Sequence, residues 1–368
     1  METKIINTIH DVAKDSWYDF TRGSLMSYEW FAYVEKIKAA CLEPFYIICY
    51  EGDRIKGVLP TFCPLTWDNV FNDFIFGRFQ RFFNPLNILG GKILLCYSPL
   101  SSGDIFWGRH IDMSTGELLI ERLEELAIHK KISIIAFLHV QETSKSEIKW
   151  LESKCYKKVF MNSVGIIEGK YSGFDEYLLS LSPVKRKAVK QDIRKFNQSG
   201  LVLTSEDYSL QLVNKIHSLL MNVNRKHNYQ PRHTNKHLLA LSFDYMQNYL
   251  NTFVVRKRGK IIATHTIIEK DGIIESFALG LDYAELGDSR SYFYVFFYNT
   301  IYEMVKKKAH YINFYRMAYK TKERRGCRTT KQYMLVRSMT NSIFIKKWFS
   351  LVNRRYQKKF EKIYTAGS

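Results

Sequence analysis

Two stretches of the sequence repeat the same order of a helix, a strand, a tight turn and a second strand. Apolar residues recur with a period near 3.6 in each helical segment, and short apolar runs flank each turn. The first copy occupies residues 24–40, 45–50 and 55–62, and the second occupies 236–250, 252–255 and 260–268. The two hairpins align at an offset of 206 residues. β-Hairpins are common, so this similarity alone could arise by chance.

The segments after each hairpin favour a true repeat. A helical segment at 115–131 leads into an apolar strand at 132–140, and a second at 291–308 leads into a strand at 311–315. The sequence therefore predicts an α/β (α+β) fold with two related halves, each a mixed central sheet flanked by helices. The predicted domains are residues 1–165 and 166–368, and the second carries a basic C-terminal helix.

Cysteine and histidine usage predicts neither disulfides nor a metal site. The six cysteines lack C-x-x-C or zinc-ligand spacing. Among the histidines between 217 and 237, His233 and His237 lie four residues apart, but this spacing does not by itself demand a metal ion. No signal-like apolar segment opens the sequence, and no run approaches the roughly 18 apolar residues of a membrane span. The expected setting is the cytoplasm, with reduced thiols.

Positive charge is concentrated near the end of the chain. The formal net charge is +19, and residues 303–368 hold 18 Lys and Arg against three acids. Such a field attracts RNA, an acidic carrier protein, a nucleotide or an anionic membrane face, although a solvated basic face is the simpler explanation. For the basic segment 346–362, packing on the second domain is favoured over a peripheral membrane contact.

A loop rich in cations comes after the strand predicted at 311–315. It carries five basic residues and a glycine, in the sequence RMAYKTKERRGC over residues 316–327. Loops at the ends of strands in α/β proteins are common places for phosphate-bearing ligands. The residues concerned are Arg316, Lys320, Lys322, Arg324, Arg325 and Gly326.

A predicted pair of helices at 174–196, interrupted at Pro183, carries a second group of cations. Arg186, Lys190 and Arg194 recur every four residues on one stripe, which is unfavourable unless an anion is nearby. A solvated helix face is the alternative. The residues expected on the buried side of the second helix are Val184, Ala188, Ile193 and Phe196.

The loop at 316–327 resembles the FemAB-like proteins with the GNAT fold, also known as BioF2-like acyltransferases. That family reads G-x-Q-G-E-H-K-x-x-R-G-F here, so Lys322, Arg325 and Gly326 match. The positions that depart from the pattern are Arg316, Tyr319, Lys320, Thr321 and Cys327. Residues 24–35 and 171–194 also resemble family segments, so the resemblance covers about the whole chain. It implies tandem GNAT-like domains.

The resemblance implies an amide-forming acyltransferase without a cofactor. Fem-type relatives use aminoacyl-tRNA as donor, and the basic C-terminal third suits an RNA backbone. The loop at 285–291 has Gly287 and Arg290 but lacks the R/Q-x-x-G-x-G/A run that binds the pyrophosphate of CoA. Acyl-CoA or acyl carrier protein is the alternative donor. The acceptor would be an amine-bearing small molecule or a cell-envelope precursor, and a non-catalytic RNA- or carrier-binding protein is the other alternative.

The candidate site residues come from the loop, the stripe and the motif. Lys322 and Arg325, carried over from the motif, would bind donor phosphate or stabilise the oxyanion. The other donor contacts would be Arg186, Lys190, Arg194, Arg290, Lys320, Arg324 and Gly326.

Amide formation from an activated donor needs a proton acceptor but no nucleophile triad. Glu275 or Asp282 at the central strand would be the general base, with Tyr319 and His265 as further candidates. For His265, a structural position in the core with satisfied hydrogen bonds is favoured over a catalytic role. Cys327 lies beside Arg325 and Arg328, so it is the one thiol considered as a nucleophile, and a packed thiol is the favoured interpretation.

Overall fold

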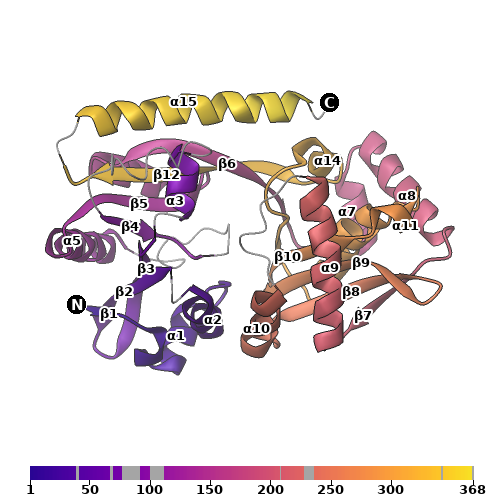
Figure 1. Ribbon diagram of the computed structural model, residues 1–368, viewed down its shortest axis with the longest axis horizontal. Coiled ribbons are helices and arrows are strands. Elements are labelled where there is room, and N and C mark those ends of the chain that lie inside the picture. Colours follow the sequence, from indigo (N-terminus) through magenta and orange to yellow (C-terminus); the bar gives the residue numbers. More distant parts are fainter. Residues whose placement is uncertain are drawn as a thin grey trace. The chain divides into compact units, whose positions relative to one another are not determined.

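The chain folds into two compact units in the computed structural model (Figure 1). The structure describes residues 1–38, 41–66, 69–76, 92–99, 112–207, 209–227, 236–340 and 343–366. The first unit comprises Met1–Arg22, Met26–Val164 and Thr330–Ser368, and the second comprises Gly23–Leu25 and Gly165–Thr329. Residues 330–368 therefore belong to the first unit. Their predicted assignment to the second domain is wrong, because a strand and a helix at the end of the chain return to the first sheet.

The first unit is built on a mixed sheet with the strand order β1-β2-β3-β4-β5-β12-β6. Strands β4 and β5 are parallel, whereas β1/β2, β2/β3, β3/β4 and β5/β12 are antiparallel. Its elements are β1 (Glu2–Ile6), η1 (Ile9–Asp11), α1 (Lys14–Phe20), α2 (Tyr28–Lys38), β2 (Leu42–Glu51), β3 (Arg54–Pro64), α3 (Val70–Phe76), β4 (Lys92–Cys96), α5 (Met113–His129), β5 (Ile132–Gln141), α6 (Lys145–Ser153), the first part of β6 (Lys157–Glu168), most of β12 (Arg328–Ser338) and α15 (Ile343–Ala366).

Helices cover this sheet through apolar side chains. Leu119 and Leu123 of α5 and Leu151 of α6 pack on one core cluster with strand residues. The C-terminal helix α15 packs along β6 and α3. Phe360 contacts Phe160, Tyr356 stacks on Phe74, and the Asn353 side chain accepts a hydrogen bond of 2.8 Å from the Phe160 amide. Among the helices of the described residues, none combines the length and apolar character of a membrane span.

The second unit contains a mixed sheet in the order β6-β11-β10-β9-β8-β7, in which the end of β6 takes part. Strands β10 and β11 are parallel, whereas β6/β11, β10/β9, β9/β8 and β8/β7 are antiparallel. Its elements are α7 (Phe174–Ser180), α8 (Pro183–Asn197), β7 (Val202–Glu206), α9 (Leu210–Lys226), α10 (Lys236–Met246), β8 (Leu250–Lys257), β9 (Lys260–Lys270), β10 (Ile273–Leu281), α11 (Tyr283–Leu286), α12 (Ser291–Phe293), the π-helical turn η3 (Tyr294–Tyr298), α13 (Asn299–Lys306), β11 (Tyr311–Asn313) and α14 (Tyr319–Glu323).

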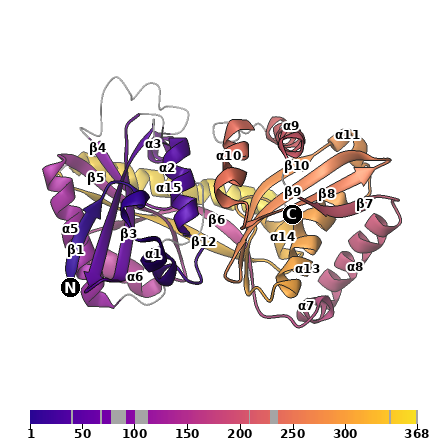
Figure 2. The same ribbon diagram turned by 90° about the horizontal axis from the view of Figure 1, so that it is seen from below.

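Helices lie on both faces of this second sheet (Figure 2). Alternation along β8 divides its side chains, because successive residues of a strand point to opposite faces. Phe253 and Val255 join the cluster formed with α7, α8 and η3, whereas Val254 joins the cluster formed with α9 and α10. The carboxyl end of β10 packs closely on α9, because a Cβ at Gly280 would lie 2.6 Å from the Leu219 Cβ, whereas β11 ends at Asn313 and leads into a loop.

Candidate functional site

The central parallel strands of the second unit pair only over three residues. Ile273 to Glu275 of β10 face Tyr311 to Asn313 of β11, and β10 then has an irregularity between Ser276 and Ala278 in its pairing with β9. Beyond Asn313 the chain leaves the sheet and enters the basic loop. Ligands of open α/β sheets bind at such carboxyl ends, so this is the candidate functional site.

The first part of the loop has an unusual backbone. Tyr315, Met317 and Ala318 have φ angles of 57°, 69° and 50°, the left-handed region that residues with a side chain seldom adopt. Such strain persists where surrounding contacts impose it. Here the Gly165 amide donates to the Tyr315 carbonyl at 3.0 Å, and the Tyr315 amide donates to the Asn313 side chain at 2.9 Å.

Lys322 of α14 holds this loop from within. Its Nζ donates hydrogen bonds of 2.6, 2.6 and 2.9 Å to the carbonyls of three successive residues, Phe314, Tyr315 and Arg316. The residue is only 2% exposed, and burial lowers the pKa of its amine to about 7. Three carbonyl acceptors favour the ammonium form, which has three protons to donate.

This geometry does not support the predicted role of Lys322. All three ammonium protons are used by the loop, so none is left for a phosphate or an oxyanion. Lys322 is instead a positioning residue for residues 314–316. Gly165 makes room for it, because a Cβ there would lie 2.5 Å from the Lys322 Cδ.

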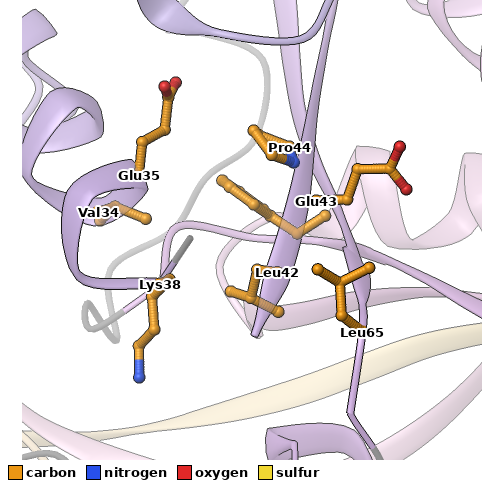
Figure 3. Close-up of a pocket in the computed structure, with 8 residues that line it drawn as sticks. Val34, Glu35, Lys38, Leu42, Glu43, Pro44 and Leu65 are labelled. Atoms are coloured by element: carbon orange, nitrogen blue, oxygen red, sulfur yellow. The ribbon is translucent and has the colours of Figure 1, made fainter. Parts of the chain in front are cut away.

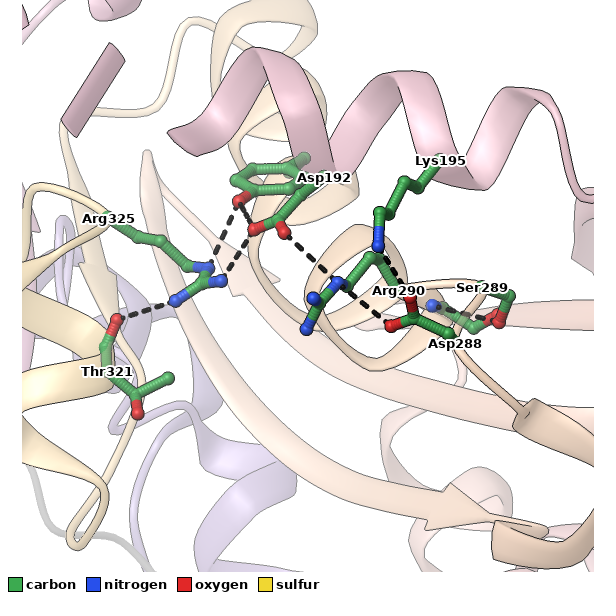
Figure 4. Close-up of polar contacts among 9 residues, drawn as sticks. Asp192, Lys195, Asp288, Ser289, Arg290, Thr321 and Arg325 are labelled. Carbon is green, nitrogen blue, oxygen red and sulfur yellow. Dashed lines mark hydrogen bonds and ion pairs between the residues drawn. The ribbon is translucent and has the colours of Figure 1, made fainter. Parts of the chain in front are cut away.

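Arg325, the second residue of the motif, is buried in an ionic network (Figure 4). Its Nη2 donates to Asp192 of α8 at 2.6 Å, its Nε to the Tyr298 hydroxyl at 3.1 Å, and its Nη1 to the Thr321 carbonyl at 3.0 Å. Tyr298 also donates to Asp192 at 2.6 Å. The guanidinium carbon lies 3.5 Å from the centroid of the Phe293 ring. Arg325 thus ties α8, η3 and α14 together.

Gly326 completes the motif for a steric reason. Its φ of +84° favours glycine, and a Cβ there would lie 2.7 Å from a methyl group of Leu181. The Tyr177 hydroxyl donates to the neighbouring Arg325 carbonyl at 2.9 Å. The three residues that match the motif therefore shape the loop, and the predicted ligand contacts of Arg325 and Gly326 are not supported by their surroundings.

The other predicted cations fall into two groups, those bound to backbone carbonyls or partly buried and those exposed to solvent. Arg186 donates to the carbonyls of Leu178, Leu179 and Leu181 and so closes the carboxyl end of α7. Lys320 is half-buried. The exposed cations are Lys190 and Arg194 on α8, Arg324 after α14, and Arg316 in the loop, at a position where the chain departs from the family motif.

Arg290 lies in the loop that precedes α12. Its φ is 61°, and its Nε lies 3.6 Å from an Asp192 oxygen and 3.4 Å from an Asp288 oxygen (Figure 4). Lys195 pairs with the other oxygen of Asp288 at 2.5 Å. A cavity of about 360 Å³ opens beside this loop, lined by Lys195, Gln198, Ser199, Leu201, Lys257, Glu285, Leu286, Gly287, Asp288 and Ser289.

The structure places the two candidate bases differently. Glu275 is buried where β10 and β11 separate, and it is hydrogen-bonded to the Tyr315 side chain. Burial and the Glu275 carboxylate raise the pKa of Tyr315 well above its usual value. Asp282 lies past the far end of β10, 3.5 Å from the Lys260 amine. Tyr319 is buried at the start of α14. Of the two carboxylates, only Glu275 is joined to the basic loop.

His265 and Cys327 are both buried in the core of the second unit. His265 is fully buried; its Nδ1 lies 3.2 Å from the Val295 carbonyl and its Nε2 2.9 Å from the Ser276 hydroxyl. The carbonyl can only accept, so Nδ1 carries the proton and Nε2 accepts from Ser276. Burial raises the pKa of the Cys327 thiol to about 12, which leaves it protonated and unsuited to nucleophilic attack.

We expect His265 to make stability depend on pH. Burial lowers its pKa to about 3, whereas an unfolded histidine titrates near 6.5. Between these values the unfolded state binds one more proton, so the free energy of unfolding should fall as the pH drops, by about 1.4 kcal/mol per unit. Urea unfolding between pH 7 and pH 4 measures this slope.

A His265→Gln variant should lower that slope by the contribution of one proton. Thr300→Val is the matched control, because Thr300 lies 3.4 Å from the same ring but does not titrate. An unchanged slope in His265→Gln would contradict the assignment.

The first unit has a larger cavity of about 580 Å³ between α2 and the start of β2 (Figure 3). Its lining residues are Val34, Glu35, Lys38, Leu42, Glu43, Pro44, Phe62 and Leu65. Glu35 accepts hydrogen bonds from the Thr8 hydroxyl, the Ile9 amide and the Tyr46 hydroxyl. Its carboxylate is thus used to fix η1 against the sheet, and the cavity walls are largely apolar.

Comparisons with known proteins agree with this architecture. The profile of the FemAB-like family, described as peptidoglycan biosynthesis/recognition, matches residues 8–274. No curated protein matches the sequence significantly. The crystal structure of FemX is similar with a TM-score of 0.63 and 11% identity, covering 91% of this chain and 97% of FemX.

Two further solved structures share the fold. A conserved protein of unknown function from Bacteroides thetaiotaomicron has a TM-score of 0.58 and 13% identity, covering 91% of this chain and 99% of its own. A tandem GNAT protein from the clavulanic acid biosynthesis pathway has a TM-score of 0.52 and 8% identity, covering 93% and 100%. The predicted fold class of tandem GNAT-like halves is confirmed.

Proposed function

Because this chain belongs to the FemAB-like family, we propose that it is an acyltransferase that moves an aminoacyl group from aminoacyl-tRNA to an amine acceptor. The observation that carries the proposal is the loop at the carboxyl end of β11. Its strained backbone is fixed by the buried Lys322, and the exposed Arg316 and Arg324 lie on the same segment. Exposed cations beside a rigid loop suit an anionic donor with a reactive carbonyl.

In the proposed reaction the acceptor amine attacks the ester carbonyl of the donor. A carbon–nitrogen bond forms, the bond from the carbonyl carbon to the ribose oxygen breaks, and the amine proton ends on that oxygen. The ester is already activated, so positioning of the two substrates supplies most of the rate. Of the two candidate bases we favour Glu275, since it joins the loop through Tyr315, whereas Asp282 lies next to Lys260.

A second donor class is supported by the cavity beside residues 285–289. Gly287 has a φ of +51°, and the cavity of about 360 Å³ lies at the loop that leads into α12. An acyl-CoA or an acyl carrier protein arm could enter there. Glu285 and Asp288 in its lining are paired with lysines, and this leaves less free positive charge than a pyrophosphate requires. We therefore favour the RNA donor.

Donor binding across a salt series tests the proposal. Charged tRNA should bind the purified protein, more weakly as salt rises, and transfer its aminoacyl group to amines. Lys190→Gln with Arg194→Gln should lower the slope of log affinity against log salt by about 1.5, the contribution of two phosphate contacts. The control pair Arg225→Gln with Lys236→Gln, exposed on α9 and α10, should leave the slope unchanged.

Other outcomes would point elsewhere. CoA binding with a shallow salt dependence and no affinity for tRNA would favour the acyl-CoA reaction. Charged tRNA that is bound but never consumed with any amine would favour a binding protein without catalysis.

A further inference from the structure

Helix α15 presents two faces of opposite character. Ile345, Phe349 and Val352 are buried against the first unit. The exposed face carries six cations and one acid, Glu361. These cations are Lys347, Arg354, Arg355, Lys358, Lys359 and Lys362. The apolar face alone accounts for the packing of the helix, so the cations need a separate explanation.

Three of the exposed cations form a straight row with Leu351. Lys347, Leu351, Arg354 and Lys358 are spaced by four, three and four residues, so they share one stripe of the helix surface over about 16 Å. Packing of Tyr356 on Phe74 and of Asn353 on β6 holds the helix in place, so this row is fixed relative to the sheet. The row is therefore held in place on the folded first unit.

Several of these cations have no internal counter-ion. Within the described residues Lys347, Arg354, Arg355 and Lys358 take part in no ion pair, whereas Lys130, Lys154 and Arg337 of the same unit pair with Glu43, Glu117 and Glu124. Arg354 and Lys358 are four residues apart on the helix, where like charges destabilise it. An external anionic surface would offset that repulsion.

We propose that the exposed face of α15 docks on an anionic lipid surface. Charge complementarity is the first argument, since four to eight cations on one amphipathic helix bind acidic headgroups. The second is Leu351, which is 57% exposed in the middle of the cationic row. An aliphatic side chain there can enter the boundary between headgroups and acyl chains, whereas it has no partner on a phosphate backbone.

A lipid surface accounts for this face better than a single-stranded nucleic acid does. Single-stranded nucleic acids stack their bases on exposed aromatic rings. The aromatic residues of α15 whose side chains are described, Trp348, Phe349, Tyr356, Phe360 and Tyr364, are all buried or partly buried. The straight row of side chains on α15 can also contact a planar lipid surface along its whole length. The inference extends beyond the proposed transfer reaction and does not depend on the donor.

Vesicle co-sedimentation of the full chain tests the docking. The protein should sediment with phosphatidylcholine vesicles that contain about one quarter phosphatidylglycerol at about 0.1 M salt, but not with phosphatidylcholine alone. The triple variant R354Q/R355Q/K358Q should lose about a hundredfold in partition coefficient, and Leu351→Gln about fivefold. These side chains are exposed, so the urea midpoint of each variant should match that of the unmodified protein.

The control triple K36Q/K145Q/K149Q removes the same charge from other exposed positions of the first unit. It should keep most of the vesicle binding. Equal losses of vesicle binding in both triple variants would show that binding depends only on net charge, and this would overturn the proposal. Absence of binding to the anionic vesicles would also overturn it, and loss of tRNA binding in the α15 triple would then assign this face to RNA.

Discussion

A Lys322→Met variant is expected to lose about 3–5 kcal/mol of unfolding free energy, together with any activity that needs the basic loop. Methionine keeps the apolar stem but removes the ammonium. The carbonyls of Phe314, Tyr315 and Arg316 would then lose a shared charged donor. Without it, the left-handed backbone at 315–318 should relax toward more common conformations. Urea unfolding monitored by circular dichroism measures the loss.

The same variant separates a positioning role from a direct role in binding or catalysis. If Lys322 contacted phosphate or an oxyanion, Lys322→Met would unfold like the unmodified protein and lose only transfer. With the observed geometry, stability should fall as well, and hydrogen exchange at the Gly165 amide, which donates to the Tyr315 carbonyl, should become faster. Arg324→Met is the matched control, because that cation is exposed two residues away and should leave stability unchanged.

Local patterns predicted the elements of the second unit well. Proline at position 183 predicted the start of a new helix, and α8 begins there. The strand predicted at 252–255 is the centre of β8, and the helix predicted at 291–308 is present as α12, η3 and α13 with a π-helical turn. The helical period and the turn residues depend on positions that are close together in the chain. They can therefore be recognised from the sequence.

The buried side of α8 was predicted less well. Val184 was expected inside but is 80% exposed, and Val189, Asp192 and Phe196 are the buried residues. Spacing could not identify Asp192 as a core residue, because an acid within a cationic helix normally faces solvent. Its partner Arg325 lies 133 residues later, so only the tertiary fold shows that the pair is buried.

The sequence predicted a cationic segment after the strand at 311–315, and this segment does follow β11, but the chemistry of its cations was not predictable from charge. Lys322 and Arg325 resemble ligand contacts in sequence because isolated cations beside a strand end usually face solvent and anions. In the fold their partners are three carbonyls and one buried carboxylate. Glu275 was selected for its place on the central strand, whereas its link to Tyr315 depends on the turn of the loop. Composition carries no information about such pairings.

Breaking the Arg325–Asp192 pair is expected to have a similarly large effect. Arg325→Met would leave the Asp192 carboxylate buried with the Tyr298 hydroxyl and Arg290, the latter only at 3.6 Å. A buried charge without its close partner costs about 3–5 kcal/mol, so unfolding should require much less urea. Loss of the guanidinium also removes its stacking on Phe293 and its bond to the Thr321 carbonyl, which should loosen α14.

A double-mutant cycle isolates the ionic part of this effect. Asp192→Asn removes the charge but keeps an acceptor for Tyr298, and the double variant with Arg325→Met should recover about 1–3 kcal/mol relative to the sum of the single losses. The recovery is expected because the double variant contains no unpaired buried charge of this pair. Strict additivity would show that Arg325 stabilises the unit through its other contacts, the stacking on Phe293 and the hydrogen bond to the Thr321 carbonyl. Lys195→Gln serves as the control, since its pair with Asp288 lies at the partly exposed rim of the same network and should contribute about 0–1 kcal/mol.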